Sequence, residues 1–416
     1  MSPHKLRFIF VCAFVCALTG MTDKAKAQGI ERVSLSGENL AEQLRQSGVN
    51  QAYNMRLGPV TLRVEADTTT SYNDNINLDK TGRISDFVMT PSFEIHARWN
   101  ITDINSLNLN LGIGYEMYLS HSQNNSLLVS PDSEAEFNFF IGDVALNVHD
   151  GFSYQQDPSQ IGQLSNTTRL ARFQNDAGIS ATWDLKDVVL SLNYDHTNFW
   201  VDQSVYSYLT NQSDTIAPKV TYNVDESIQA GLNTSFSDVR YEQSFQNDYR
   251  TYSAGPFVTA KISKNLSVDA QAGGYLSEYS KGAGNGDSEN INSYYASAGV
   301  THRINNAINE SLTVGREFLP GLTSNFTERI YANYANAWQA TPYIRVASNL
   351  WWENLNDSNA TFRETSNRYG VGLNADDSLT EHLTLSLRYQ YILKDANPSS
   401  LSYYQDLGTV ELHYQF

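Results

Sequence analysis

Cysteine is almost absent from this chain of 416 residues. Its two cysteines, Cys12 and Cys16, both lie within residues 1–27. That segment starts with basic residues, continues with a short apolar run and ends in an Ala-Lys-Ala motif at Ala27, which is the pattern of a secretory signal peptide. Cleavage near Ala27 would leave a chain without cysteine, which excludes a disulfide framework, a thiolate metal site and a cysteine nucleophile.

Long hydrophobic runs and positive charge are also scarce. No segment reaches the run of about 18 apolar residues that a transmembrane helix needs. Lysine and arginine number 28 against 45 aspartates and glutamates, for a net charge of −17. Binding to nucleic acid requires clustered basic residues, so a nucleic-acid partner is excluded. The mean hydropathy of −0.41 is typical of soluble proteins, but a β-barrel with one apolar face per strand has a similar average.

Catalytic and metal-binding motifs are missing as well. The histidines of the cleaved chain stand in no metal-ligand spacing, and no Gly-x-Ser-x-Gly motif occurs. Asp195 and His196 are adjacent on a predicted strand, so their side chains point to opposite faces and cannot act together as an acid–base pair. The sequence therefore predicts no catalytic residue, no metal site and no cofactor.

The chain does have a terminal strand that alternates apolar and polar residues from Val410 to its last residue, Phe416. Soluble domains rarely end in an apolar strand, since an exposed edge of this kind invites aggregation. Bacterial outer-membrane β-barrels commonly end this way, with aromatic residues at the lipid–water interface. We therefore expect a location in the bacterial outer membrane, surrounded by lipid and lipopolysaccharide. The barrel-assembly machinery is the expected partner of the strand that ends at Phe416.

Segments with the same period of two continue back to residue 58. We count eighteen of them: 58–71, 87–99, 105–118, 132–141, 143–153, 173–184, 187–200, 211–223, 226–240, 248–262, 265–279, 291–303, 308–319, 325–338, 342–354, 365–376, 381–393 and 402–416. Short and long connections alternate, as periplasmic turns and extracellular loops do in outer-membrane barrels. The long ones include 72–86, 119–131, 154–172, 280–290 and 394–401.

These segments predict an all-β fold, a transmembrane antiparallel up-and-down β-barrel of about 18 strands over residues 58–416, with 16 strands as the alternative. A soluble β-helix would need a fixed short repeat, and none occurs. A soluble sandwich of this length would need several domains, but no linker divides the chain after residue 58. Residues 28–57 lie outside the pattern and are expected to form a periplasmic N-terminal segment, either a mobile leader or a partial plug.

The polar face of each strand defines the predicted interior. If the apolar faces contact lipid, charges of both signs face the lumen, and water must fill it, because an unpaired charge in a dry core costs on the order of several kcal/mol. A basic wall facing acidic residues would produce a transverse field, although ordinary solvated charges are the simpler interpretation. The predicted pore-lining residues are Arg63, Glu65, Glu94, His96, Arg98, Glu116, Asp269, Arg345, Arg368, Arg388, Glu411 and His413.

Two further surfaces suggest partners. Acidic residues in or beside the long loops would either recruit divalent cations shared with lipopolysaccharide or be ordinary solvated loop residues; these are Asp132, Glu134, Asp287 and Glu289. Small residues on the lipid-facing side of segment 265–279 would give a flat interface for a homo-oligomer, although small residues are also common in monomeric barrels. They are Ala270, Ala272 and Gly274.

The chain resembles the β-barrel porin 2 family over one stretch, at Arg56–Val64 and Ser71–Ile76. In that family a first strand runs into a Tyr-Asn-Asp-Asn turn, which here is Tyr72-Asn73-Asp74-Asn75. The resemblance implies an outer-membrane barrel with a pore and brings no catalytic residues. Some members of the family are found near exopolysaccharide-biosynthesis genes.

Three functions are consistent with these features. The first is a passive channel for polar or charged small solutes through a hydrated lumen. The second is a barrel for exopolysaccharide secretion or assembly, in which the inward aromatic residues Phe257, Tyr275 and Trp351 would stack on sugar rings. The third is a non-conducting structural or surface barrel whose lumen is plugged.

Overall fold

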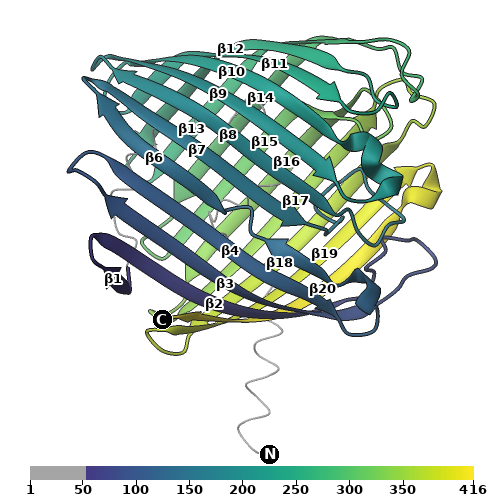
Figure 1. Cartoon of the computed structure of the whole chain (residues 1–416), viewed down its shortest axis with the longest axis horizontal. Coiled ribbons are helices and arrows are strands. Elements are labelled where there is room, and N and C mark those ends of the chain that lie inside the picture. Colours follow the sequence, from purple (N-terminus) through teal and green to yellow (C-terminus); the bar gives the residue numbers. More distant parts are fainter. Residues whose placement is uncertain (1–52) are drawn as a thin grey trace, which may run out of the picture.

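The structure is a computed structural model that describes residues 53–416, so the predicted signal peptide and most of the segment 28–57 lie outside the described residues. The described chain is a sheet of strands with three short 3₁₀ helices (Figure 1). The strands are β1 (Met55–Leu57), β2 (Val60–Asn73), β3 (Asp86–Asn100), β4 (Ser106–Tyr118), β5 (Ser126–Val129), β6 (Glu134–Ile141), β7 (Val144–Gln155), β8 (Arg172–Asp184), β9 (Val188–Val201), β10 (Asn211–Asn223), β11 (Ile228–Tyr241), β12 (Tyr249–Ser263), β13 (Leu266–Tyr279), β14 (Ile291–Arg303), β15 (Ile308–Pro320), β16 (Phe326–Gln339), β17 (Ile344–Asp357), β18 (Thr365–Ser378), β19 (Leu383–Asn397) and β20 (Tyr403–Gln415). The helices are η1 (Ser122–Asn124), η2 (Ser204–Leu209) and η3 (Ser399–Leu401).

The sheet closes into a barrel of 18 antiparallel strands. Successive strands pair with their neighbours, and β20 pairs with β2 from Glu65↔Gln415 to Asn73↔Leu407. Closure removes both free edges of the sheet, so no unpaired strand is left to promote aggregation. The predicted fold class and strand number are therefore confirmed, and the alternative of 16 strands is wrong.

Two strand segments fall where the sequence predicted none. Met55–Leu57 pairs with the start of β2 as β1, although the prediction placed it in the N-terminal segment 28–57. Ser126–Val129 forms β5 inside the predicted loop 119–131 and pairs with the end of β4, while β6 pairs with the start of β4. Thus β5 and β6 together make one strand of the barrel, interrupted at residues 130–133. Both segments are strands because they pair with a neighbouring strand. A strand of three or four residues is too short to show an alternating pattern in the sequence.

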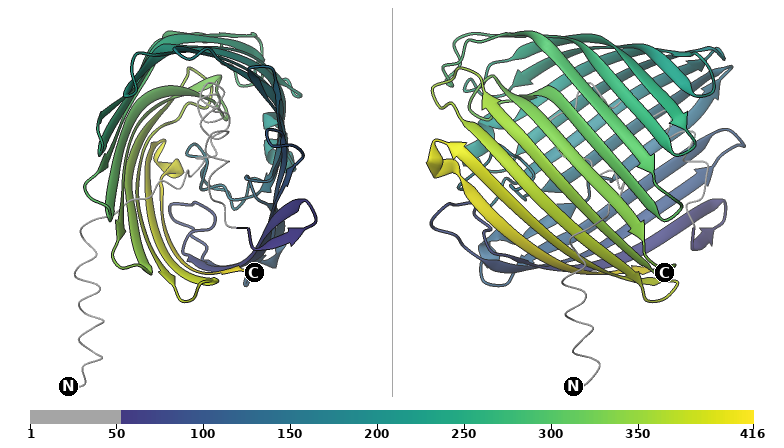
Figure 2. Two further views of the ribbon diagram at one scale, coloured as in Figure 1. Left: turned by 90° about the vertical axis from the view of Figure 1, so that its left-hand side faces the viewer. Right: turned by 180° about the vertical axis from the view of Figure 1, so that it is seen from behind.

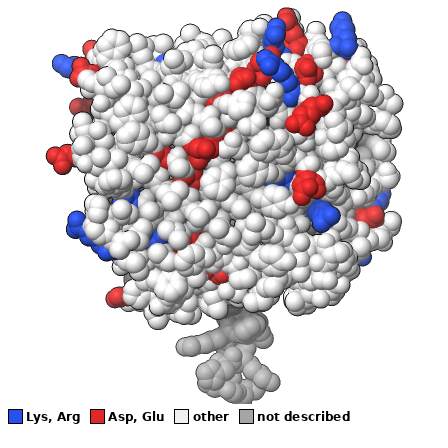
Figure 3. Space-filling view, in the orientation of Figure 1, with Lys and Arg blue, Asp and Glu red and all other residues white. Residues whose placement is uncertain are grey.

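The outer face of the barrel is apolar and its inner face is polar, with the predicted parity. Large apolar side chains such as Leu192 and Leu350 are each 50% exposed on the outside. An exposed apolar belt of this extent requires an apolar environment. Figure 3 shows a wall with few charges, which gather along one diagonal line and near the rims. Within residues 53–416, no helix is long and apolar enough to cross a membrane.

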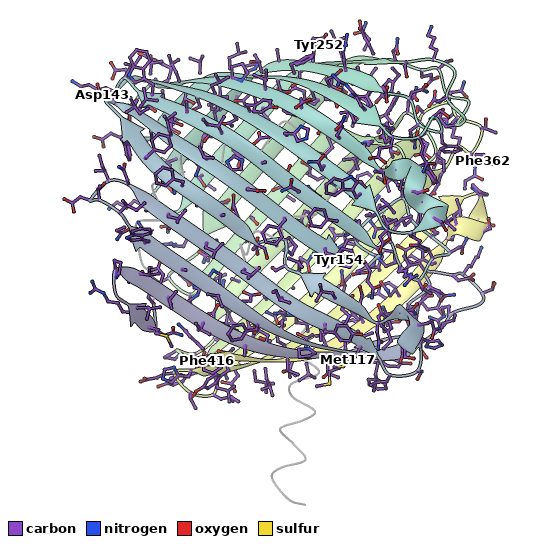
Figure 4. All side chains as sticks on the ribbon, viewed as in Figure 1. Met117, Asp143, Tyr154, Tyr252, Phe362 and Phe416 are labelled. Carbon is purple, nitrogen blue, oxygen red and sulfur yellow. The ribbon has the colours of Figure 1, made fainter. Side chains whose placement is uncertain are left out.

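Short turns lie at one rim of the barrel and long loops at the other. In Figure 4, Asp143 in the turn between β6 and β7 marks the short-turn rim, and Phe362 in the loop between β17 and β18 marks the long-loop rim. Phe416, at the end of the chain, lies on the short-turn side. All three 3₁₀ helices lie in connections of the long-loop rim.

The wall is not paired along its full height between β14 and β15. Their register ends at Ala296↔Arg316, so the long-loop ends of the two strands separate at a seam. Arg316 Nη1 donates a hydrogen bond to the carbonyl oxygen of Tyr294 at the seam. Phe318 is on the outward parity of β15, yet its ring stacks on the inward-facing Tyr275 at 5.1 Å. The end of β15 therefore bends into the barrel.

Candidate functional site

The connection between β7 and β8, residues 156–171, folds into the barrel instead of outward. Its apolar residues Ile161, Leu164 and Leu170 are buried in a cluster with Leu322 from another loop. The side chain of Lys394, which is fully buried on the inner face of β19, donates to the carbonyl oxygen of Gln163 at 3.0 Å. We call residues 156–171 the inner loop, because it reaches from one wall of the barrel to the opposite one (Figure 2).

Charged residues of β17 and β18 fasten the inner loop. Arg368 Nη2 donates to the carbonyl oxygen of Ser159 at 3.0 Å, and Arg368 also forms an ion pair with Glu353. Gly162 lies so close to this pair that a Cβ atom there would be 2.5 Å from Arg368 Nη1. The sequence predicted Arg368 as pore-lining; it does face inward, but it is only 5% exposed because the inner loop covers it.

A second segment, residues 74–85 between β2 and β3, also turns inward. Leu78 is fully buried and packs on Ile392 and Tyr403, which face inward from β19 and β20. Its carbonyl oxygen accepts a hydrogen bond from the backbone N–H of Asn166, so the two inward segments touch. In the same segment, the backbone N–H groups of Gly82 and Thr81 donate to the Asp79 carboxylate and lower its pKa.

The two inward segments change the prediction about what fills the lumen. The sequence pointed to residues 28–57 as the candidate plug, and residues 28–52 lie outside the described chain. Figure 2, in its end-on view, shows described segments inside the ring of strands. The signal that could have found the inner loop is its apolar content, since a solvated loop gains nothing from Ile161, Leu164 and Leu170.

All twelve predicted pore-lining residues lie on the inward parity of their strands, and the structure brings one group of them together. Arg63 and Glu65 on β2, Glu94 and His96 on β3, and His413 on β20 form a cluster that we call the His–Glu cluster. His96 Nε2 is 3.4 Å from Glu65 Oε2, and His413 Nε2 is 3.5 Å from Glu65 Oε1. Sequence spacing could not show this cluster, because strand pairing creates it.

Other predicted residues lie apart from this cluster. Arg388 and Glu411 form their own ion pair at 2.9 Å on β19 and β20. Arg345 on β17 lines an open pocket of about 430 Å³ with Lys261 and Arg303 at the short-turn rim. Four inward residues lie outside these three sites: Arg98, Glu116, Asp269 and Arg368.

The inward aromatic residues are packed. Tyr275 stacks on Phe318, and Trp351 lies under the Arg368 guanidinium at 5.0 Å. Phe257 is only 6% exposed, and Lys219 Nζ lies 4.4 Å from its ring centroid. Each of the three rings thus has a protein group against one face, which reduces the stacking surface that is open to a sugar ring.

The long loops interlock at their rim. Asp287 is 2% exposed, and its carboxylate accepts hydrogen bonds from the backbone N–H of Asn325 at 2.9 Å and from the Ser358 hydroxyl. It therefore joins three loops, and the expectation that Asp287 is an ordinary solvated loop residue is wrong. Glu289 accepts a hydrogen bond from the backbone N–H of Asn359 at 3.2 Å.

The side chains of Asp195 and His196 point to opposite faces of β9, as the alternation of side chains along a strand predicts. Asp195 faces inward and lies 3.0 Å from His149 Nε2, whereas His196 faces outward and lies 2.9 Å from Asp214. The two neighbours therefore belong to different faces of the wall and to different ion pairs.

Comparisons with known proteins agree with this architecture. No protein-family model and no curated protein sequence matches the chain, so the β-barrel porin 2 resemblance receives no support from a family match. Among solved structures, OccK1 (OpdK) of Pseudomonas aeruginosa aligns with a TM-score of 0.51 and 10% identity, over 85% of this chain and 98% of that chain. The fold is porin-like.

Two other barrels show the same relation. OpdQ of Pseudomonas aeruginosa aligns with a TM-score of 0.52 and 11% identity, over 86% of this chain and 99% of that chain. A BenF-like porin from Pseudomonas fluorescens Pf-5 aligns with a TM-score of 0.52 and 9% identity, over 86% of this chain and 100% of that chain. Identities this low show a shared fold alone.

Proposed function

We propose that this protein is an outer-membrane channel through which small polar or charged solutes diffuse passively. The observation that carries the proposal is the exposure of inward-facing charges inside a closed barrel. The Arg388 side chain is 49% exposed, and Lys261 and Asp269 on the opposite wall are exposed as well. Solvent therefore reaches these groups inside the barrel, and a charged side chain is far more stable in contact with water than in a dry core. The lumen is therefore hydrated.

The membrane location follows from the outer face. A belt of exposed apolar side chains requires lipid, and a closed barrel satisfies its backbone hydrogen bonds without water. The short turns and Phe416 would then lie on the periplasmic side and the interlocked long loops outside. Lipid and lipopolysaccharide would surround the wall, and the barrel-assembly machinery would engage the last strand. A secretory signal ending near Ala27 would direct the chain there.

The charges of the lumen are arranged on opposing walls. The carboxylates Glu65 and Glu94 of the His–Glu cluster are on β2 and β3, and the basic pocket of Lys261, Arg303 and Arg345 is on strands from β12 to β17, across the barrel. Carboxylates on one wall and basic side chains on the other would produce a transverse field that orients dipolar solutes as they pass. The inner loop narrows the path between them, which selects for small solutes.

Planar-bilayer recording of the refolded protein tests this proposal. We expect discrete conductance steps that are absent when the same preparation is denatured before it is added. Folded barrels that insert into the bilayer and never conduct ions would refute the channel.

A plugged, non-conducting barrel is the second candidate, and the two inward segments are the observation that favours it. A deletion within the inner loop, between Asp157 and Arg169, distinguishes the channel from the plugged barrel. A channel shows a larger conductance after this deletion, whereas a plugged barrel conducts only after it. Export of exopolysaccharide rests on the family resemblance alone, since the inward aromatic residues are packed. A deletion strain with unchanged matrix polysaccharide would argue against it.

A further inference from the structure

Three side chains from two adjacent strands converge on one point of the lumen wall. Glu65 of β2 and Glu94 of β3 are direct cross-strand partners, and His96 follows Glu94 by two residues on the same face. The ligand atoms of the three residues lie within 4.8 Å of one another. His96 Nε2 is 3.4 Å from Glu65 Oε2 and 3.7 Å from Glu94 Oε2.

These separations are close to those between ligands of one metal ion. Zinc binds imidazole nitrogen and carboxylate oxygen at about 2.0–2.2 Å, which places tetrahedral ligand atoms roughly 3.3–3.6 Å apart. The distance from His96 to Glu65 lies within this range, and the distance from His96 to Glu94 exceeds it by about 0.1 Å. A small rotation of Glu94 would close the difference.

A hydrogen bond to Asn110 fixes the orientation of the His96 ring. Its Nδ1 lies 2.9 Å from the amide oxygen of Asn110, which can only accept a hydrogen bond. Nδ1 therefore carries a proton, and Nε2 is the ring nitrogen that faces the two carboxylates. Metal-binding histidines are held in the same way, with the outer ring nitrogen donating to an oxygen. His413 repeats the arrangement, with Nδ1 2.6 Å from Asp67 and Nε2 facing Glu65.

Counted with neutral histidines, this part of the lumen wall carries an excess of negative charge. Glu65, Asp67 and Glu94 contribute three negative charges, and Arg63, with Nε 3.2 Å from Glu65 Oε2, contributes one positive charge. The neighbouring Arg388 and Glu411 balance each other. Directly opposed glutamates such as Glu65 and Glu94 repel across a strand pair. Two negative charges remain, and either two protonated histidines or one divalent cation would balance them.

We propose that Glu65, Glu94 and His96 form a binding site for a divalent transition-metal ion on the lumen wall. One imidazole and two carboxylates are a ligand set suited to zinc, with water from the lumen in the fourth position. His413 then holds the second oxygen of Glu65. Arg63 Nη2 lies 3.0 Å from His96 Nε2, so the guanidinium competes with the metal ion for this nitrogen. The Arg63 side chain would move into the lumen when the ion binds. The site is independent of what the channel conducts.

Zinc binding to the refolded mature chain, freed of metal and measured against a chromophoric chelator, tests the site. We expect one ion per chain. Binding should weaken at least tenfold in His96→Ala and in Glu65→Gln. Arg63→Gln removes the competing cation and should bind at least tenfold more tightly than the unmodified chain, an effect that a salt-bridge network alone does not produce. A shift in electrophoretic mobility on heating, which a folded barrel shows and an unfolded chain does not, verifies that each variant was folded.

His302→Ala is the matched control. His302 lies 2.9 Å from Glu310, and no third ligand joins this pair among the described residues, so its loss should leave zinc binding unchanged. Equal binding by the unmodified chain and His96→Ala would overturn the site, as would the absence of binding in both the unmodified chain and Arg63→Gln. If Glu65→Gln does not fold, the comparison of Arg63→Gln with the double variant Arg63→Gln, His96→Ala decides.

Discussion

Replacement of Lys394 by methionine should release the inner loop from the opposite wall. The Lys394 ammonium is fully buried, pairs with Glu364 at 2.7 Å and donates to the inner loop at Gln163 and Ser165, each at 3.0 Å. Methionine keeps the volume of the aliphatic stem and removes every one of these bonds. Breaking a buried ion pair costs about 3–5 kcal/mol, because the remaining carboxylate loses its partner.

A cost of about 3 kcal/mol would raise the detached population of the inner loop roughly a hundredfold. The barrel wall should remain intact, since the strand ladder does not depend on Lys394. We expect larger and noisier single-channel currents, together with tryptic cleavage at Arg169 inside the inner loop. Lys281→Met, at an exposed lysine of the loop between β13 and β14, is the control. A Lys394→Met barrel with the currents and cleavage pattern of the unmodified protein would refute the role of this anchor.

Three other changes probe the rest of the molecule. Replacing Lys261, Arg303 and Arg345 by glutamine should shift ion selectivity toward cations about fivefold, since a unit charge at contact distance in water is worth about 1 kcal/mol; an unchanged reversal potential in a salt gradient would contradict it. Asp287→Ala leaves its loop partners unsatisfied at a cost of about 1–3 kcal/mol, so limited proteolysis should cut the long loops faster, and equal rates would exclude this role. Phe416→Ser should lower the amount of heat-modifiable barrel in cell envelopes, and a yield equal to the unmodified chain would argue against recognition of the last residue.

The barrel itself was predictable because its information is local. Each strand has to present one face to an apolar environment and the other to water, so apolar and polar residues alternate within every segment. The same alternation assigned residues such as Glu65, His96 and Arg388 to the inward face without any knowledge of pairing. The short strands β1 and β5 were missed because three or four residues cannot display a period.

The interior was less predictable because its contacts join distant parts of the chain. Residues 156–171 contain only a few apolar residues, and the partners that stabilise their inward path, such as the buried Lys394 and Arg368, lie across the barrel on other strands. The separation of β14 from β15 is likewise accompanied by a contact between distant residues, the stack of Phe318 on Tyr275. Neither the inward path of the loop nor the separation of the two strands produces a periodic pattern in the sequence.

The amino-acid sequence alone determined the class of fold, the number of strands and the face on which each side chain lies, since these depend on alternation along single strands. Only the tertiary structure decided which inward residues meet. Strand register placed Glu65 opposite Glu94, and closure of β20 onto β2 brought His413 to the same carboxylate. The side chains that cluster in the lumen are separated by up to several hundred residues, so the cluster exists only once the barrel has closed.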